Sequence, residues 1–370
     1  MAFVSVLAAF FLVSYSLVIF FIKYWWENNS SYADNGSADR VSFLSVVIPF
    51  HNEEAFLYPL LKSLKNQLLS SEKYEVVFVD DKSTDGSSYL IRRLASQYRF
   101  YNYRIVEGEG RGKKAALYTG INLARGDLIV TTDADIVAGR RWLSSILSSY
   151  ITKPHAFTAS PVTMEHTNSF LEKFSALDFI AMQICGGGLI KGGHPVFCSG
   201  ANLCFEKDLY FRVIGQTDGR CYQSGDDVFL LHAAATNNES ITFLKNRDAM
   251  VKTFPKKSWL ELFKQRVRWG GKSKGYKNID AIVLTFIVFL TNLSFTLLFF
   301  LALFFNPTFL IWWVLFLSIK AVTDYILISS GKEFFDIEFS TLQFLLFSFI
   351  YPFFVTVSGI AAIILKERWK

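Results

Sequence analysis

The segment from Ala2 to Ile22 is an uninterrupted apolar run without a charged residue. About 20 such residues are needed to cross the hydrocarbon core of a bilayer, which is about 30 Å thick. A cleaved secretory signal is the alternative. However, no basic residue precedes the run, and Tyr24-Trp25-Trp26-Glu27 is not a small-residue cleavage site. The run therefore predicts a transmembrane anchor over residues 1–24.

Three more apolar stretches follow Asp280, over residues 281–305, 309–329 and 342–365. They predict a C-terminal membrane domain of about three segments over residues 279–370, and membrane residence explains a composition that is 51% hydrophobic. Lys320 and Asp324 lie i,i+4 in the middle stretch, where an ion pair would offset part of the cost of charge in lipid. That stretch is alternatively interfacial.

Basic residues predict the orientation of the chain in the membrane. Residues 252–277 contain nine Lys and Arg against the single acid Glu261, immediately before an apolar stretch. The positive-inside rule then places the central region in the cytoplasm of a multi-pass protein, which we expect in the plasma or inner membrane. Four spans would leave the carboxyl terminus outside, which fits poorly with its Lys366, Arg368 and Lys370.

The formal charge of +6 does not indicate nucleic acid, because the excess lies beside a membrane segment where anionic lipid headgroups are nearer partners. The four cysteines lack paired CxxC spacing, and a cytoplasmic domain would keep them reduced. We therefore expect neither a zinc site nor a disulfide framework.

Residues 25–40 are predicted to be a linker, since Asn28 to Arg40 is rich in Asn, Ser, Asp and Gly. In the domain predicted over residues 41–278, apolar strands alternate with helices. The strands are expected at 43–50, 74–79, 104–106 and 127–132, and the helices at 55–69, 87–98 and 114–124. This alternation predicts a doubly wound α/β sheet.

Polar clusters fall at the carboxyl ends of three of these strands, where ligands of such sheets bind. They are His51-Asn52-Glu53-Glu54, Asp80-Asp81-Lys82-Ser83 and Asp133-Ala134-Asp135. No GxGxxG follows the first strand, which argues against a dinucleotide site. The sequence therefore predicts one acidic cleft.

Asp133 and Asp135 form a pair of carboxylates directly after a strand. Such a pair can hold Mg²⁺ or Mn²⁺, which favour carboxylate oxygens and keep positions open for substrate phosphates. A solvated turn or a helix cap is the alternative for an isolated Asp-x-Asp. The position at a strand end favours the metal site.

Two adjacent acids, Asp80 and Asp81, end the second strand. A carboxylate there can accept hydrogen bonds from a nucleobase or a ribose hydroxyl, a role that we assign mainly to Asp81. Residues 83–85 are alternatively caps of the next helix. Further on, Gly110-Arg111-Gly112-Lys113-Lys114 precedes a helix. Its flexible backbone and its cations suit an approach to phosphates, so we expect Lys113 to lie beside a bound phosphate.

Asp226 and Asp227 follow Gly225 at the start of another apolar helix. Helix capping is the simpler interpretation of Asp226, whereas Asp227 is a candidate general base for an acceptor hydroxyl. Residues 259–269 are amphipathic and predict a helix on the membrane surface. Within it, Arg268 is placed to contact a phosphate and Trp269 to stack on a sugar or acceptor.

Six motifs together resemble glycosyltransferase family 2, over about Val46 to Trp269. In chain order they are Val46-Val47-Ile48-Pro49-Phe50-His51-Asn52-Glu53-Glu54, Phe78-Val79-Asp80-Asp81-Lys82-Ser83-Thr84-Asp85-Gly86, Asp133-Ala134-Asp135, Ser199-Gly200-Ala201-Asn202, Gly225-Asp226-Asp227 and Gln265-Arg266-Val267-Arg268-Trp269. The last resembles the Gln-x-x-Arg-Trp motif of the membrane-bound branch of the family.

The resemblance implies a GT-A fold, a Rossmann-like doubly wound domain with a mixed sheet. It implies inverting transfer from a UDP- or GDP-sugar, with the acceptor deprotonated by Asp227, assisted by Asp226, while the metal-bound nucleoside diphosphate leaves. The implied donor residues are Pro49, Asn52, Glu53, Asp80, Asp81, Lys113 and Asp133, the implied metal ligands are Asp133 and Asp135, and the implied acceptor or diphosphate residues are Gly200, Asn202, Gln265, Arg268 and Trp269.

Single transfer to a membrane-associated, lipid acceptor is the leading interpretation, because three C-terminal segments are few for a secreting pore. A processive polysaccharide synthase with a polysaccharide acceptor is the first alternative. A catalytically silent GT-A membrane scaffold and a nucleotidyltransferase are alternatives from other classes. The sugar and the base of the nucleotide depend on pocket shape.

Overall fold

The computed structural model describes residues 2–29, 43–165, 169–216 and 226–365. Most of the predicted linker, Gly225 and the three terminal basic residues lie outside these ranges. The chain forms two compact units. Unit 1 comprises Met1–Asn29, His166–His194 and Pro255–Lys370, and unit 2 comprises Ser30–Glu165 and Pro195–Phe254. Parts of the predicted 41–278 domain thus group with the terminal helices.

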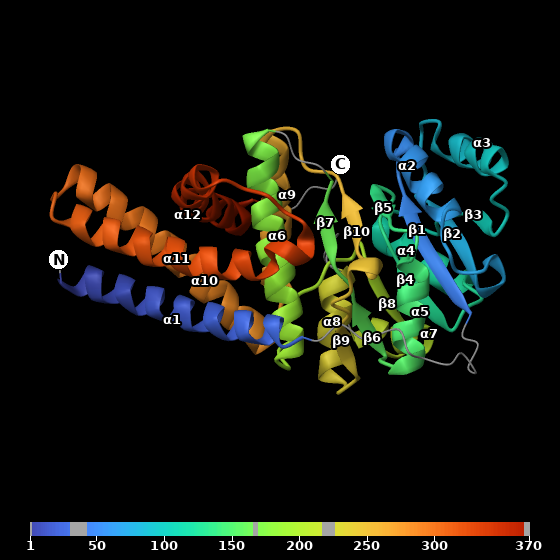
Figure 1. The fold of residues 1–370 in the computed structure, drawn as a ribbon, viewed down its shortest axis with the longest axis horizontal. Helices are drawn as coiled ribbons and strands as arrows, with labels where there is room; N and C mark the ends of the chain where they lie inside the picture. Colours follow the sequence, from blue (N-terminus) through green and yellow to red (C-terminus); the bar gives the residue numbers. More distant parts are fainter. Residues whose placement is uncertain (1, 30–42, 166–168, 217–225, 366–370) are drawn as a thin grey trace. The chain divides into compact units, whose positions relative to one another are not determined.

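Unit 2 is built on a seven-stranded sheet with the strand order β3-β2-β1-β4-β8-β6-β9 (Figure 1). Its strands are β1 (Leu44–Phe50), β2 (Tyr74–Asp80), β3 (Tyr103–Glu107), β4 (Leu128–Thr131), β6 (Phe157–Ala159), β8 (Leu203–Glu206) and β9 (Ile241–Phe243). The first four are parallel, while β8 runs antiparallel to both β4 and β6. The predicted α/β class with a mixed sheet is confirmed.

The helices and a second small sheet complete unit 2. The three-stranded sheet has the order β5-β10-β7, with β5 (Ile136–Ala138), β7 (Val162–Met164) and β10 (Val251–Thr253). The helices are α2 (Glu54–Lys65), α3 (Ser87–Tyr98), α4 (Lys113–Leu123), α5 (Trp142–Thr152), α7 (Lys207–Val213) and α8 (Asp226–Thr236), with 3₁₀ turns η1 (Ser71–Lys73), η2 (Ile214–Gln216) and η4 (Arg247–Ala249).

Helix α4 lies very close to the parallel strands because Gly120 faces them. A Cβ atom at Gly120 would lie 2.5 Å from Cγ1 of Val47 in β1 and 2.7 Å from Cγ2 of Val79 in β2. A larger residue would push the helix away from the sheet. This close packing determines where the amino end of α4, with Lys113, meets the strand ends.

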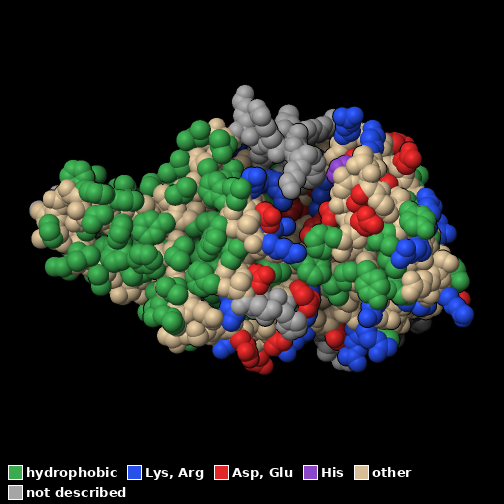
Figure 2. Space-filling view, turned by 90° about the horizontal axis from the view of Figure 1, so that it is seen from above, with side chains coloured by type: hydrophobic (Ala, Val, Ile, Leu, Met, Phe, Trp, Pro, Cys, Tyr) green, Lys and Arg blue, Asp and Glu red, His purple; other side chains and the backbone are tan. Residues whose placement is uncertain are grey.

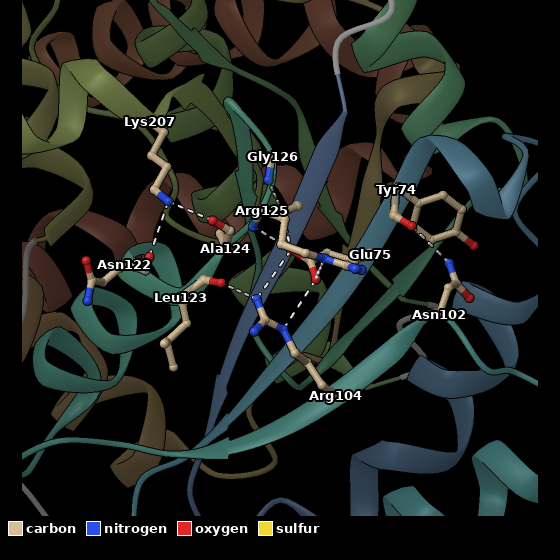
Figure 3. Close-up of polar contacts among 11 residues, drawn as sticks. Tyr74, Glu75, Asn102, Arg104, Asn122, Leu123, Ala124, Arg125, Gly126 and Lys207 are labelled. Carbon is tan, nitrogen blue, oxygen red and sulfur yellow. Dashed lines mark hydrogen bonds and ion pairs between the residues drawn. The ribbon is translucent and has the colours of Figure 1, made fainter.

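The buried carboxylate of Glu75 connects the amino ends of the parallel strands (Figure 3). Glu75 in β2 is 1% exposed and accepts hydrogen bonds from the Ser45 hydroxyl (2.8 Å) and the Arg125 N–H (2.7 Å). The guanidinium groups of Arg125 and Arg104 pair with its other oxygen at 3.0 and 3.3 Å. Burial alone would raise the pKa of Glu75, but these partners outweigh it and hold the pKa below its usual value.

We expect the change Glu75→Gln to lower the free energy of unfolding by about 2 kcal/mol, the scale of hydrogen bonds to a charged group. Thermal unfolding of the full chain in detergent measures it, with Glu72→Gln as the control, since Glu72 is exposed on η1. Because the folded pKa is depressed, the contribution is present above the unfolded pKa of about 4.3 and is lost as the pH falls through the folded pKa. Equal melting of both variants at neutral pH would contradict this role.

Unit 1 consists of helices from three separate parts of the chain (Figure 1). They are α1 (Ala2–Glu27), α6 (Phe170–Lys191), α9 (Trp259–Gly271), α10 (Ile279–Phe304), α11 (Phe309–Phe335) and α12 (Thr341–Ile364), with the 3₁₀ turn η5 (Lys272–Gly275). Aromatic side chains fill its core, including Phe295 against Trp313 and Phe174 against Phe347. The predicted anchor and the three predicted C-terminal segments coincide with α1 and α10 to α12.

Among the described residues, five helices are long and apolar enough to cross a membrane: α1, α6, α10, α11 and α12. Large apolar side chains are exposed along α1 and α10 to α12, for example Phe10, Phe304 and Ile311, and Figure 2 shows hydrophobic side chains gathered over these helices. Helix α6 was not among the predicted spans, because Glu172, Lys173 and Asp178 interrupt its apolar residues. The chain is a membrane protein.

Candidate active site

The residues after β1 and those after β2 hold each other in place. Asn52 has a left-handed backbone (φ 57°), and its side-chain oxygen accepts hydrogen bonds from the N–H groups of Thr84 (2.8 Å) and Asp85 (3.3 Å). The N–H of Glu53 donates to the Ser87 hydroxyl at 3.0 Å. Pro49 lies within β1 itself. The predicted donor residues of both strand ends thus lie together at one edge of the sheet.

Asp80 and Asp81 have different surroundings. The Asp80 carboxylate accepts from the N–H of Ser83 (2.7 Å) and the hydroxyl of Ser88 (2.5 Å), and thereby holds the turn into α3. Both oxygens of Asp81, which is 9% exposed, accept from the N–H of Gly112 at 2.9 Å. Asp81 therefore holds the loop that precedes α4, where Gly112 has a φ of 91° that favours glycine.

Lys113, the first residue of α4, interacts with three acidic residues of unit 2. Its ammonium group pairs with the Asp133 carboxylate and interacts electrostatically with Asp226 and Asp227. Partial burial disfavours the charge, but Asp133 and then the other two acids outweigh it and raise the pKa of Lys113 above its usual value. Lys114 lies 3.6 Å from Asp226. Residues about 110 positions apart in the sequence thus meet at one place.

Asp227 is held at the amino end of α8 by backbone groups. One carboxylate oxygen accepts from the N–H of Gly200 at 3.0 Å, and the other accepts from the N–H of Val228 at 2.9 Å. The thiol of Cys198 donates to the Asp227 carbonyl at 3.6 Å. This arrangement keeps the carboxylate in one orientation and places Gly200 directly beside it.

The side chain of Asn202 is held inside the protein. It is fully buried, donates to the carbonyls of Pro161 (2.9 Å) and Ala249 (2.8 Å), and accepts from the Trp142 indole N–H (3.0 Å). With its amide satisfied, Asn202 supports the loop that presents Gly200. Its predicted role in acceptor binding remains a prediction.

Gln265, Arg268 and Trp269 lie on α9 and therefore belong to unit 1. The ring of Trp269 lies 4.4 Å from the guanidinium of Arg266 and 6.3 Å from the ring of Phe179. The predicted amphipathic helix exists. Its roles in binding remain predictions.

Asp133 and Asp135 follow β4 and are both partly exposed, on either side of the buried Ala134. No group of three or more His, Cys, Asp or Glu able to hold a metal occurs in the described part of the chain. The protein therefore offers at most a pair of carboxylates from this segment. That donor set fits an ion such as Mg²⁺ or Mn²⁺ that takes its remaining ligands from substrate phosphates and water.

Lys114 and Ser88 were not among the predicted site residues. A signal for Lys114 was present, since it is the second of two lysines at the start of a helix and its neighbour was selected. Ser88 bonds Asp80 only because the chain turns back over eight residues. That geometry has no sequence pattern of its own.

Comparison with known proteins agrees with this arrangement. A family model described as glycosyl transferase family 2 matches residues 45–197. A structure of a mannosyltransferase from Pyrobaculum calidifontis, in complex with GDP-Man and Mn²⁺, is similar over 98% of each chain, with a TM-score of 0.58 and 17% identity. At this identity the similarity shows the fold.

Curated relatives match shorter segments. An undecaprenyl-phosphate 4-deoxy-4-formamido-L-arabinose transferase from Aeromonas hydrophila is 40% identical over 99 residues, which are 26% of this chain and 30% of the relative. A dolichyl N-acetyl-alpha-D-glucosaminyl phosphate 3-beta-D-2,3-diacetamido-2,3-dideoxy-beta-D-glucuronosyltransferase from Methanococcus voltae is 31% identical over 110 residues, 30% of this chain and 34% of the relative. The matches thus span about a third of these relatives.

The mixed sheet and the order of its strands define a domain of the GT-A type. Over residues 45–197 the chain matches glycosyl transferase family 2.

Proposed function

We propose that this enzyme transfers one sugar from a nucleotide-sugar to a lipid acceptor in the membrane, with inversion at the anomeric carbon. The observation that carries the proposal is the gathering of Asp133, Asp226 and Asp227 around Lys113. Asp133 follows strand β4, Lys113 begins helix α4, and Asp226 and Asp227 begin helix α8. A cation beside carboxylates suits a reaction in which a diphosphate leaves while a proton is removed from the acceptor. Sugar transfer requires both events.

The donor, a UDP- or GDP-sugar, would lie over the carboxyl ends of β1, β2 and β4. Its diphosphate would meet the amino end of α4, where Lys113 and the first N–H groups of the helix attract anions. Asn52, Glu53 and Asp81 border the same edge and would face the nucleoside. The mannosyltransferase of similar fold was solved with GDP-Man, which supports a donor of this chemical class.

Asp133 and Asp135 would hold Mg²⁺ or Mn²⁺. When bound, the metal would neutralise charge on the departing nucleoside diphosphate. The Mn²⁺ in the structure of similar fold supports this assignment. Lys113, paired with Asp133, would add positive charge beside the same phosphates.

Asp227 would accept the proton of an acceptor hydroxyl as its oxygen attacks the anomeric carbon. The new bond forms on the face opposite the breaking bond to the diphosphate, which inverts the configuration. The N–H groups of Gly200 and Val228 would keep the base oriented without neutralising it. Asp226, beside Lys114, would support the charge balance.

A lipid acceptor is supported by the membrane helices of the chain and by the names of its relatives, which are transferases of undecaprenyl-phosphate and dolichyl-phosphate compounds. Arg268 and Trp269 of α9 would bind the acceptor or the diphosphate. The basic residues 252–277 support a cytoplasmic position for the catalytic domain, where nucleotide-sugars are made available.

Product analysis tests this function. Membranes containing the protein would be supplied with a panel of UDP- and GDP-sugars, and the lipid and polysaccharide fractions analysed by mass spectrometry. We expect the mass of one sugar added to a lipid, with membranes lacking the protein as the control. A long polymer would instead establish a processive synthase.

A further inference from the structure

Six polar residues form a connected chain inside unit 1, which we call the buried polar chain. It comprises Arg266, Asp178, Tyr351, Lys320, Asp324 and Tyr15, contributed by helices α9, α6, α12, α11, α11 and α1. Four of the six carry formal charge. Ionisable residues are costly inside a membrane and mark function more often than stability. The chain therefore requires an explanation.

One end of the buried polar chain lies on α9. The guanidinium of Arg266 pairs with the carboxylate of Asp178 on α6, and the two side chains are 12% and 2% exposed. The same guanidinium lies over the ring of Trp269, one turn further along α9, at 4.4 Å from its centroid. Arg266 thus joins α6 to the aromatic residue of the Gln-x-x-Arg-Trp motif.

The middle of the chain is Tyr351 on α12. Its side chain interacts electrostatically with the Asp178 carboxylate, and the ammonium of Lys320 lies 5.3 Å from the centre of its ring. The ring also stacks on Phe347 at 4.8 Å. Tyr351 is therefore linked to both charged pairs, to one through its hydroxyl and to the other through its ring.

The other end confirms the predicted ion pair within α11. Lys320 donates to Asp324 at 2.5 Å, and the two residues are 1% and 5% exposed. The hydroxyl of Tyr15 on α1 donates to the second oxygen of Asp324 at 2.7 Å. Through these contacts α1, α11 and α12 are held in one register.

Buried ion pairs are weak stabilisers, because desolvation of the charges cancels much of their attraction. Their best-attested use is to specify one arrangement, since any shift of a helix leaves a charge unpaired. Apolar contacts alone would let α9 rotate or slide with little loss of packing free energy. A chain of directed contacts that ends on Arg266 does not allow this.

A second observation points to the same helix. The side-chain oxygen of Gln265 is buried and has no hydrogen-bond partner among the residues that the structure describes. A buried acceptor without a partner is costly unless a ligand donor satisfies it. Gln265 adjoins Arg266, so the rotation of α9 that pairs Arg266 also determines where this oxygen points.

We propose that the buried polar chain sets the rotation and register of α9, so that Asp178, Tyr351, Lys320 and Asp324 are positioning residues for sugar transfer. The inference rests on the proposed role of α9 in binding the acceptor or the diphosphate. It adds residues of the membrane helices to the determinants of the reaction.

Hydrogen–deuterium exchange of the full-length protein in detergent tests the proposal directly. The variant Tyr351→Phe removes the hydroxyl that interacts with Asp178 and keeps the aromatic ring. We expect the amides of residues 259–271 to exchange about tenfold faster, the scale of one hydrogen bond to a charged group. The variant Tyr325→Phe is the control, because it removes the hydroxyl of an exposed tyrosine of α11 that lies outside the buried polar chain.

Kinetics supply a second readout. The assay uses UDP- and GDP-sugars and a lipid extract of native membranes. Tyr351→Phe should raise KM for the lipid about tenfold. Binding of UDP or GDP should be unchanged, because the residues proposed to bind the nucleotide lie on unit 2. A merely structural defect would weaken nucleotide binding as well. Equal exchange over residues 259–271 in wild type and Tyr351→Phe, or equal acceleration by Tyr325→Phe, would overturn the inference.

The inference and the proposed function can fail separately. If Arg268→Ala and Trp269→Ala transfer sugar as wild type does, α9 has no role in binding, whatever the exchange shows. If those variants lose transfer but Tyr351→Phe changes neither exchange nor KM, the role of α9 stands and the buried polar chain does not position it.

Discussion

Replacing Asp227 by Asn is expected to lower the rate of sugar transfer by about 10³-fold, within the range that a general base contributes. An amide cannot take up the acceptor proton. Its oxygen can still accept one of the hydrogen bonds from Gly200 and Val228, so the start of α8 should remain folded. Initial rates with radiolabelled donor, together with calorimetry of nucleotide binding, separate lost chemistry from lost binding.

Asp208→Asn is the matched control, since Asp208 is also an acid in the first turn of a helix of unit 2 but is exposed. We expect it to transfer sugar at the wild-type rate. The size of the rate loss in Asp227→Asn also indicates the kind of acceptor.

An acceptor phosphate monoester, with a second pKa of about 6, is largely ionised at pH 7 and has little need of a base. Retention of more than a tenth of the rate would exclude Asp227 as a base for a hydroxyl.

Gly200→Ala examines the same carboxylate without removing it. A Cβ atom there would lie 3.3 Å from both Cβ and Oδ2 of Asp227, so the carboxylate must shift. Misplacement of a catalytic group by about 1 Å can cost about 10²-fold in rate. Gly215→Ala is the control, because nothing lies within 4 Å of a Cβ atom at that position. If both variants keep wild-type rates, the position of Asp227 is not critical.

The second large effect is expected for Asp135→Ala, which should lower transfer by at least about 10²-fold, the cost of removing one group that stabilises charge in a transition state. It would leave Asp133 as the single carboxylate of the pair. The Mn²⁺ concentration needed for half-maximal rate should rise as well, because a carboxylate ligand has been lost. Titration of the rate with Mn²⁺ and with Mg²⁺ measures both effects.

Asp127→Ala is the control for this change, since Asp127 is exposed at the opposite end of β4. We expect it to leave both the rate and the metal requirement unchanged. Equal metal requirement in Asp135→Ala and wild type would remove Asp135 from the metal site. A lower rate without a shift in metal requirement would indicate a role in binding the donor.

The long elements of the fold were predictable from sequence. The parallel strands β1, β2 and β4 are buried on both faces, so they appear as continuous apolar runs that local pattern reveals. Helix α3 begins and ends at the predicted residues, because its amphipathic spacing is regular. The apolar helices α1 and α10 to α12 were found for the simple reason that lipid requires long uncharged stretches.

The short strands were not predictable. Strands such as β5, β7 and β10 have three residues each, too few for an alternating pattern, and they exist because their partners arrive from distant parts of the chain. Helix α6 was not predicted as a candidate span, although it is long, because it contains charged residues. Its charge at Asp178 breaks the apolar run, and the contacts of Asp178 with Arg266 and Tyr351 explain how that charge is tolerated.

By itself, the sequence determined that this protein has membrane helices, that its catalytic domain is an α/β sheet with acids at the strand ends, and which acids these are. These properties follow from local composition and period. Tertiary structure alone decided that Lys113 meets Asp133, Asp226 and Asp227, and that the side chain of Asn202 is buried. It also decided that Lys320 and Asp178 belong to one polar chain. Such meetings depend on how distant segments pack, because charges and hydrogen bonds act over a few ångströms of space and not along the sequence.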